Sequence, residues 1–285
     1  MSNPSTNSSF LLTGFSGMEQ QYPWFSIPFS SIYATMLLGN CMVLHVIWTE
    51  PSLHQPMFYF LSILALTDLC MGLSTVYTIN LDFCITQSYF IHGLSFIESS
   101  VLLAMAFDRY IAICNPLRYS SILTNSRISK IGLTIIVRSF FFIIRLKFFN
   151  YCHFHILSHS FCLHQDLLHL ASLMLVICIL LLTAILILFS YILIFKSVLA
   201  VASQEEWHKL FQTCISHVCA VLVFYMPIIS LTMVHRFGKH LSPVAHVLIG
   251  NIYSLFPPLM NPIIYSVKTQ QIHTRMLRLF SLKRY

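Results

Sequence analysis

Charged residues are scarce in this chain. Only 9% of its 285 residues are Asp, Glu, Lys or Arg, whereas 57% are hydrophobic. A water-soluble domain carries about 25% charged residues, so a soluble core cannot account for this composition. The composition is that of a membrane protein, and the net charge of +7 has no soluble basic domain through which to bind nucleic acid.

The sequence also lacks the motifs of several membrane-protein and enzyme classes. It contains no HExxH spacing and no Ser or Cys in a nucleophile motif, so we expect no enzyme activity. The last apolar window, Ser242 to Val267, has no lysine for a retinal Schiff base, which argues against a retinal-binding photoreceptor or pump. Neither inverted repeats nor a long linker is present, which argues against a transporter and for one domain over residues 1–285. A small membrane transporter stays an alternative.

Long apolar windows predict the fold. A bilayer core about 30 Å thick is crossed by about 20 apolar helical residues. Seven windows of this kind lie between charges, Pro or Asn, and we expect an all-α bundle of seven transmembrane helices. The windows are Ile27–Trp48, Pro56–Ile79, Cys84–Ile113, Ile131–Phe149, Leu173–Phe195, Leu210–Val234 and Ser242–Val267.

The distribution of Lys and Arg predicts the orientation, because short cytoplasmic loops are enriched in both residues. With the N-terminus outside, eleven of the sixteen lie in the cytoplasm and four outside, and Arg138 falls within the fourth window. The eleven are Arg109, Arg118, Arg127, Lys130, Lys196, Lys209, Lys268, Arg275, Arg278, Lys283 and Arg284. We therefore expect a multi-pass plasma-membrane protein with its N-terminus extracellular and its C-terminus cytoplasmic.

Both ends of the chain lie outside the windows. Residues 1–26 show no signal-peptide pattern, so the first helix is expected to direct insertion. This segment holds the sequon Asn7-Ser8-Ser9, which we expect to be glycosylated. Residues 268–285 form the cytoplasmic tail. Its part from Lys268 to Phe280 alternates apolar and basic residues, as in a short amphipathic helix on the membrane surface, although a frayed basic tail is the alternative.

Four charged residues fall inside or at the end of the second and third apolar windows, where charge is costly. Asp108 and Arg109 stand side by side at the cytoplasmic end of the third window, where they form either a switchable charge pair or a simple helix anchor. Asp68 and Glu98 lie deeper and should face the interior of the bundle. They are expected to meet a proton, a cation or polar neighbours there.

Six stretches in order along the chain carry a resemblance to a known family. They are GN at Gly39-Asn40, PMFYFLSILALTD at Pro56–Asp68, MAFDRYIAICNPLRY at Met105–Tyr119, SY at Ser190-Tyr191, KLFQTCISH at Lys209–His217 and PPLMNPIIY at Pro257–Tyr265. The chain resembles a rhodopsin-like (class A) G-protein-coupled receptor, and more closely an odorant (olfactory) receptor. The stretches FIHGLSFIESSVLLAMAFDRY, FCLHQD and HRFG further resemble the fish-like class I branch.

The resemblance implies a function and a set of partners. A small-molecule odorant binds the bundle, and the opened bundle activates a heterotrimeric G protein of the stimulatory olfactory type. By resemblance the activation switch and coupling residues are Asp108, Arg109, Tyr110, Lys209, Asn261, Pro262 and Tyr265. By resemblance Asp68 helps to hold an allosteric Na⁺, and Glu98 is similar to a nearby acid of odorant receptors. We expect a Na⁺ site of Asp68 and Glu98, which Asn40 and Asn261 could complete, and buried protonated acids are the alternative. No other metal and no cofactor is expected.

Pocket residues are predicted on the outer halves of the helices, because helix-bundle pockets are apolar with a few convergent polar groups. His92, Gln165, Thr232 and Arg236 are the candidates for odorant binding. Members of the class I branch respond to short polar odorants such as carboxylic acids, and a guanidinium can hold both oxygens of a carboxylate. Arg236 is therefore the predicted anchor, unless it only reaches toward the outer lipid headgroups.

The cysteines match the family only in part. By resemblance Cys84 and Cys162 form the disulfide between the third helix and the second extracellular loop. The position where Cys152 would find a partner is Ser172. Five histidines in the same loop, His153, His155, His159, His164 and His169, leave open either a metal site or a merely polar loop.

By comparison with odorant receptors, residues are expected to be missing on the outer face. Only four residues separate Ile79 from Cys84, so the second helix should stop early and the first extracellular loop should be almost absent. Shortening is also expected near IIRLKFF and before LASLMLVICILLL. A truncated, poorly expressed or non-signalling receptor homologue is therefore the alternative to a working receptor.

Overall fold

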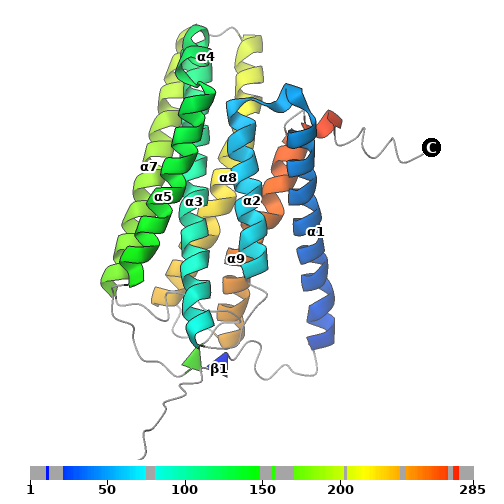
Figure 1. Ribbon diagram of the computed structural model, residues 1–285, viewed down its shortest axis with the longest axis vertical. Coiled ribbons are helices and arrows are strands. Elements are labelled where there is room, and N and C mark those ends of the chain that lie inside the picture. The colour runs from blue at the N-terminus through cyan, green and yellow to red at the C-terminus, as the bar shows by residue number, and fades with distance from the viewer. Residues whose placement is uncertain are drawn as a thin grey trace, which may run out of the picture.

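The computed structural model describes residues 11–12, 22–74, 81–147, 156–157, 170–201, 204–237, 242–268 and 272–275. Nearly all of them are helical, and the long helices run side by side as an elongated bundle (Figure 1). Seven long helices make up this bundle, which confirms the predicted all-α seven-helix fold. They are α1 (Tyr22–Thr49), α2 (Pro56–Ser74), α3 (Leu81–Cys114), α5 (Asn125–Lys147), α7 (Leu170–Val201), α8 (Gln204–Phe237) and α9 (Pro243–Lys268).

Short elements complete the described fold. Two 3₁₀ turns, η2 (Pro51–Leu53) and η3 (Pro116–Arg118), and the one-turn helix α4 (Tyr119–Ile122) lie between long helices. Two-residue strands β1 (Leu11–Leu12) and β2 (Ile156–Leu157) pair in parallel. This contact between the N-terminal segment and the connection before α7 was not predicted. Residues 272–275 are helical, as expected for part of the amphipathic tail helix.

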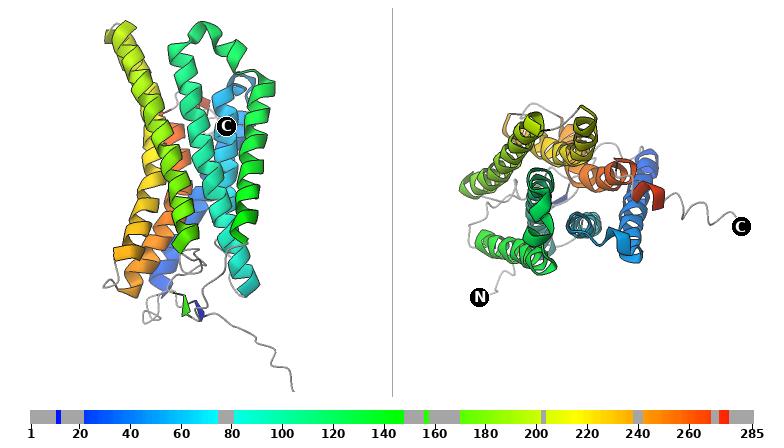
Figure 2. Two further views of the ribbon diagram at one scale, coloured as in Figure 1. Left: turned by 90° about the vertical axis from the view of Figure 1, so that its left-hand side faces the viewer. Right: turned by 90° about the horizontal axis from the view of Figure 1, so that it is seen from above.

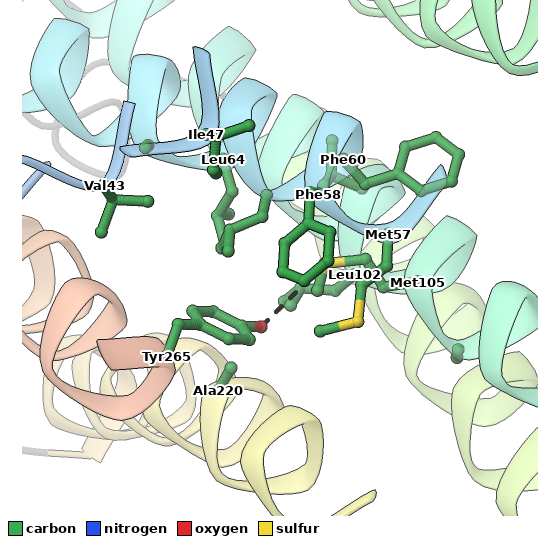
Figure 3. Packing of buried hydrophobic residues seen from close by; sticks show 14 of the residues in the cluster. Val43, Ile47, Met57, Phe58, Phe60, Leu64, Leu102, Met105, Ala220 and Tyr265 are labelled. Carbon is green, nitrogen blue, oxygen red and sulfur yellow. Dashed lines mark hydrogen bonds between the residues drawn. The ribbon is translucent and has the colours of Figure 1, made fainter. Parts of the chain in front are cut away.

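Helix α3 lies at the centre of the packing. It contacts α2, α5, α7 and α8, whereas α1 packs against α2 and α9 at one side (Figure 2). The main hydrophobic core joins residues of most helices, including Val43 of α1, Leu64 of α2, Leu102 of α3 and Tyr265 of α9 (Figure 3). Many outward-facing side chains are also large and apolar, such as Leu38, Leu133 and Leu188. Apolar surface of this kind fits a helix bundle surrounded by lipid.

Six of the long helices have the length and mean hydropathy of membrane spans among the described residues. The seventh, α5, carries Arg127, Lys130 and Arg138 along its length, and its apolar content is correspondingly lower. It nevertheless packs against α2 and α3 as the bundle requires. The cations on α5 therefore need an explanation separate from the packing of the bundle.

Helix α2 is described over most of its apolar window. The window extends to Ile79, the described part of the helix reaches Ser74, and the description resumes with α3 at Leu81. Residues 75–80 lie outside the described chain, so the early stop of the second helix stays a prediction. Gln87 of α3 donates its side-chain amide to the carbonyl oxygen of Ser74 at 2.7 Å. That hydrogen bond ties the last described turn of α2 to α3.

Helices α8 and α9 each contain proline in their interior. Pro227 lies within α8 and Pro262 within α9, and each helix continues through its proline. Proline removes one backbone hydrogen bond at such a position. We expect a kink at each site.

Candidate functional site

A buried polar cluster joins three helices in the middle of the bundle. Asn261 of α9 donates from its amide nitrogen to both carboxyl oxygens of Asp68 of α2, at 3.2 and 3.0 Å. The carboxyl group of Glu98 on α3 lies within hydrogen-bonding reach of Asp68. All three side chains are buried, and the Glu98 Oε1 atom has no hydrogen-bond partner among the described residues. The predicted intramembrane acids therefore face one another inside the bundle.

Asn40 was predicted to join this cluster, but its side chain makes other contacts. Its side-chain nitrogen donates to the carbonyl oxygens of Met36 at 3.0 Å and of Pro258 at 2.9 Å. The bond to Pro258 ties α1 to α9. The hydrogen bonds that the structure gives Asn40 go to the backbone, whereas Asp68, Glu98 and Asn261 come together as predicted.

The Asp108–Arg109 charge pair is held by a third residue. Asp108 is buried, and its Oδ2 atom lies 4.0 Å from the Nε atom of Arg109. Tyr119, in the connection after α3, donates its hydroxyl hydrogen to Asp108 Oδ1 at 2.9 Å. Burial raises the pKa of the Tyr119 hydroxyl, and the neighbouring Asp108 raises it further. The phenol therefore stays protonated at neutral pH and keeps its hydrogen for Asp108.

Two tyrosines lie close to this end of the bundle. Tyr265, the last residue of the NPIIY stretch, is fully buried, and its hydroxyl lies 4.0 Å from the sulfur of Met105 on α3 (Figure 3). Tyr191 of α7 forms a 2.6 Å hydrogen bond with Nδ1 of His217 on α8. Tyr191 and His217 both fall in stretches that carried the family resemblance, but no role was predicted for either. Their hydrogen bond joins α7 to α8 in the region of the predicted switch residues.

Of the predicted odorant-binding residues, two have described side chains. His92 is buried on α3, and Thr232 is half-buried on α8, where its hydroxyl donates to the Ile228 carbonyl. Their neighbours Ile91 and Leu231 share one buried hydrophobic cluster, so α3 and α8 meet at this level. Gln165 and the side chain of Arg236 lie outside the described part of the chain.

A network of hydroxyl groups on α3, α7, α8 and α9 was missed by the sequence analysis. Ser99 lies 2.7 Å from Thr183 Oγ1 and 2.9 Å from the Tyr225 hydroxyl, and those two partners are 2.8 Å apart. One helical turn earlier, Ser95 bonds the Tyr253 hydroxyl at 2.9 Å. The i, i+4 spacing of Ser95 and Ser99 was the available signal, because polar side chains in a membrane helix face the interior.

Several other predicted positions lie outside the described residues or side chains. These are Asn7, the disulfide cysteines Cys84 and Cys162, the coupling residue Lys209, and the histidines after α5. Among the described residues, no group of three or more His, Cys, Asp or Glu side chains could hold a metal ion. The roles predicted for these positions stay predictions.

Comparison with known proteins places the chain. The family model for "Olfactory receptor" matches residues 29–283. The chain is 85% identical to human olfactory receptor 51V1, over 99% of this chain and 95% of that protein, and 44% identical to mouse olfactory receptor 51E2, over 97% and 94%. Squid rhodopsin shares the fold, with a TM-score of 0.71 at 17% identity, over 88% of this chain and 83% of that chain. The chain therefore belongs to the olfactory receptor family of rhodopsin-like G-protein-coupled receptors.

Proposed function

We propose that this receptor responds to short polar odorants such as carboxylic acids, and that it activates a stimulatory G protein that raises cyclic AMP. The proposal adds a ligand class and a coupling type to the family assignment. The observation that supports the activation step is the Asp108–Arg109–Tyr119 arrangement, in which one buried acid is shared between an arginine and a tyrosine. A shared partner of this kind can release Arg109 when the helices around it move.

The mechanism is a shift of population between two states of the bundle. A ligand that binds the open state better moves the equilibrium by its differential affinity. In the described state Asp108 is held by Tyr119, Tyr265 is packed on Met105, and Tyr191 is bonded to His217. Opening requires these contacts to rearrange. Odorant binding must therefore act on them at a distance, through movement of the helices.

The odorant is proposed to bind toward the opposite end of the bundle, with His92, Thr232, Gln165 and Arg236 as its polar contacts. Arg236 would hold a carboxylate by paired, charge-assisted hydrogen bonds. The buried hydroxyl network below it, which includes Ser99 and Tyr225, links α3 to α8. That network offers a physical route from an odorant on these two helices to the switch region.

A sodium ion is the proposed allosteric partner of the buried acids. Asp68 and Glu98 present hard oxygen donors inside the bundle, and Glu98 Oε1 is without a protein hydrogen bond among the described residues. A cation there would relieve the repulsion between two adjacent carboxylates. Asp68, Glu98 and Asn261 fit such a site. Asn40, whose nitrogen is bonded to two backbone carbonyls, would join through its side-chain oxygen.

The test is cyclic AMP accumulation in intact cells that display an N-terminally tagged receptor. Short carboxylic acids should raise cyclic AMP. Arg236→Ala should raise the half-maximal concentration by about tenfold or more, because a hydrogen bond to a charged group contributes about 1.5–3 kcal/mol. Lys239→Ala removes a neighbouring cation and is the matched control. In the same cells, replacing extracellular Na⁺ by choline should raise the basal signal, and Asp68→Asn should remove that difference.

Each outcome bears on one part of the proposal. An acid response that survives Arg236→Ala removes the anchor and keeps the receptor. A receptor that reaches the surface but raises no cyclic AMP with any acid contradicts the ligand class or the G-protein type. Retention inside the cell without any signal would instead identify a non-signalling homologue.

A further inference from the structure

Helix α5 presents a stripe of polar and cationic residues on one face. Lys130, Thr134 and Arg138 follow one another at four-residue spacing, so they lie above one another on the helix surface. All three are exposed in the bundle. Arg138 is eight residues from Lys130, which places it about 12 Å farther along the helix axis. A membrane helix rarely turns two cations outward, because a charge facing hydrocarbon is costly.

The stripe forms one wall of a cleft between α3, α5 and α7. The cleft has a volume of about 540 Å³. Lys130 and Arg138 lie on its α5 side, and its other lining is largely apolar, with Leu103 and Phe107 from α3 and Leu186 and Phe189 from α7. The cleft is therefore an apolar groove with two positive charges along one edge.

The hydrogen bonds that the structure gives the cleft residues supply no anion to Lys130 or Arg138. The hydroxyl of Thr134 donates to the Lys130 carbonyl, and that of Ser190 donates to the Leu186 carbonyl. Arg138 donates one hydrogen bond, from Nη2 to the Ser100 hydroxyl oxygen at 3.0 Å. Among the described residues, no carboxylate lies within 4.0 Å of Lys130 or Arg138. The missing partner must come from outside the described chain.

We propose that this cleft binds one anionic phospholipid of the adjacent leaflet. The ammonium group of Lys130 would bind the lipid phosphate. The free N–H groups of Arg138 would donate to the ester carbonyl oxygens, which lie deeper than the phosphate in any glycerophospholipid. An acyl chain would cover the apolar lining formed by Leu103, Phe107, Leu186 and Phe189. This inference rests on the proposed orientation, in which the Lys130 end of α5 faces the cytoplasmic leaflet.

Side-chain direction supports this arrangement. The Cα–Cβ bonds of an α-helix tilt toward its N-terminus, so long side chains extend that way. The N-terminus of α5 is its Asn125 end, close to Lys130. The guanidinium of Arg138 can therefore reach back toward the level of Lys130, and the two cations can act on one lipid. A second copy of this chain would add another apolar helix with the same cations and would leave both charges unpaired.

Native mass spectrometry of the purified full-length receptor tests the site directly. The receptor is mixed with phosphatidylglycerol and phosphatidylcholine of identical acyl chains, and the retained lipid is identified. We expect phosphatidylglycerol to be retained preferentially. Lys130→Gln and Arg138→Gln should each lower this preference by about fivefold, because a basic residue near an anionic lipid surface contributes about 1 kcal/mol. Arg118→Gln removes an exposed cation outside the cleft and is the matched control.

A fourth variant separates lipid binding from folding. Ala104→Phe keeps both cations but fills the cleft, and it should also abolish the preference. Equal retention of the two lipids by the unaltered receptor would overturn the proposal, as would an equal loss in Arg118→Gln. A dimer that forms on this face and is lost in Ala104→Phe, with no lipid preference, would make the cleft a contact between copies. None of these measurements depends on an odorant or on a G protein.

Discussion

Gly39 allows α1 to approach α9 closely at Pro262. A Cβ atom at Gly39 would lie 3.1 Å from both Cβ and Cγ of the Pro262 ring, and that ring cannot rotate away. We predict that Gly39→Ala lowers the free energy of unfolding by about 1–3 kcal/mol relative to a matched glycine, as overpacking in a core does. The thermal unfolding midpoint of the purified receptor measures this effect.

Gly132 of α5 is the control for that substitution. Its Cβ would meet Ile63 Cδ1 at 3.6 Å, which is an ordinary contact. Both alanine variants gain the same helix propensity, about 1 kcal/mol, so their difference isolates the steric cost at Pro262. Equal midpoints for the two variants would show that α1 and α9 can separate without cost.

Residue-level predictions succeeded where charge inside the membrane made burial expensive. Asp68, Glu98 and Asn261 meet in the bundle because each would otherwise be unpaired in hydrocarbon. The sequence did not indicate that Tyr119 bonds Asp108, because eleven residues and a turn separate them. It also missed the Ser99–Thr183–Tyr225 network, since single hydroxyl residues are common in membrane helices and only the fold brings these three together.

At the scale of elements, a neighbouring helix holds the last described turn of α2. The Gln87 side-chain amide of α3 donates to the Ser74 carbonyl in that turn at 2.7 Å. We predict that Gln87→Glu, which keeps the side-chain length but removes the donor, destabilises this end by about 1 kcal/mol. Amide hydrogen exchange in the last turn of α2 should become faster.

Ser88→Ala changes the next residue of α3 and serves as a control for substitution near the start of this helix. Unchanged exchange in Gln87→Glu would mean that water or another group takes over the carbonyl.

Helix ends were the least predictable feature of the elements. All seven apolar windows coincide with long helices, but α8 begins at Gln204 rather than Leu210, and α7 continues to Val201 rather than Phe195. Hydropathy identifies the part of a helix that crosses hydrocarbon, whereas backbone hydrogen bonding continues into polar residues beyond it. The ion pair between Glu50, after α1, and Arg275, at 3.2 Å, likewise joins segments whose proximity only the fold establishes.

At the scale of the whole molecule, the family assignment confirms the predicted multi-pass membrane receptor. Members of this family are receptors, so the prediction that the chain is not an enzyme also holds. The alignment with olfactory receptor 51V1 extends over 306 positions, whereas this chain has 285 residues, so at least 21 positions are gaps in this chain. This agrees with the predicted shortening. Its placement on the outer face stays a prediction.

Glycosylation at Asn7 tests the proposed orientation of the whole chain. An N-linked glycan is added only on the side of the membrane that becomes extracellular, and Asn7-Ser8-Ser9 is an acceptor sequence. We predict that glycosidase treatment increases the electrophoretic mobility of the receptor and that Asn7→Gln removes this shift. Asn3→Gln is the control, because Pro4 disables the Asn3 sequon. A receptor without any glycan, whose N-terminal tag is stained only after permeabilisation, would reverse the orientation and move Lys130 to the opposite leaflet.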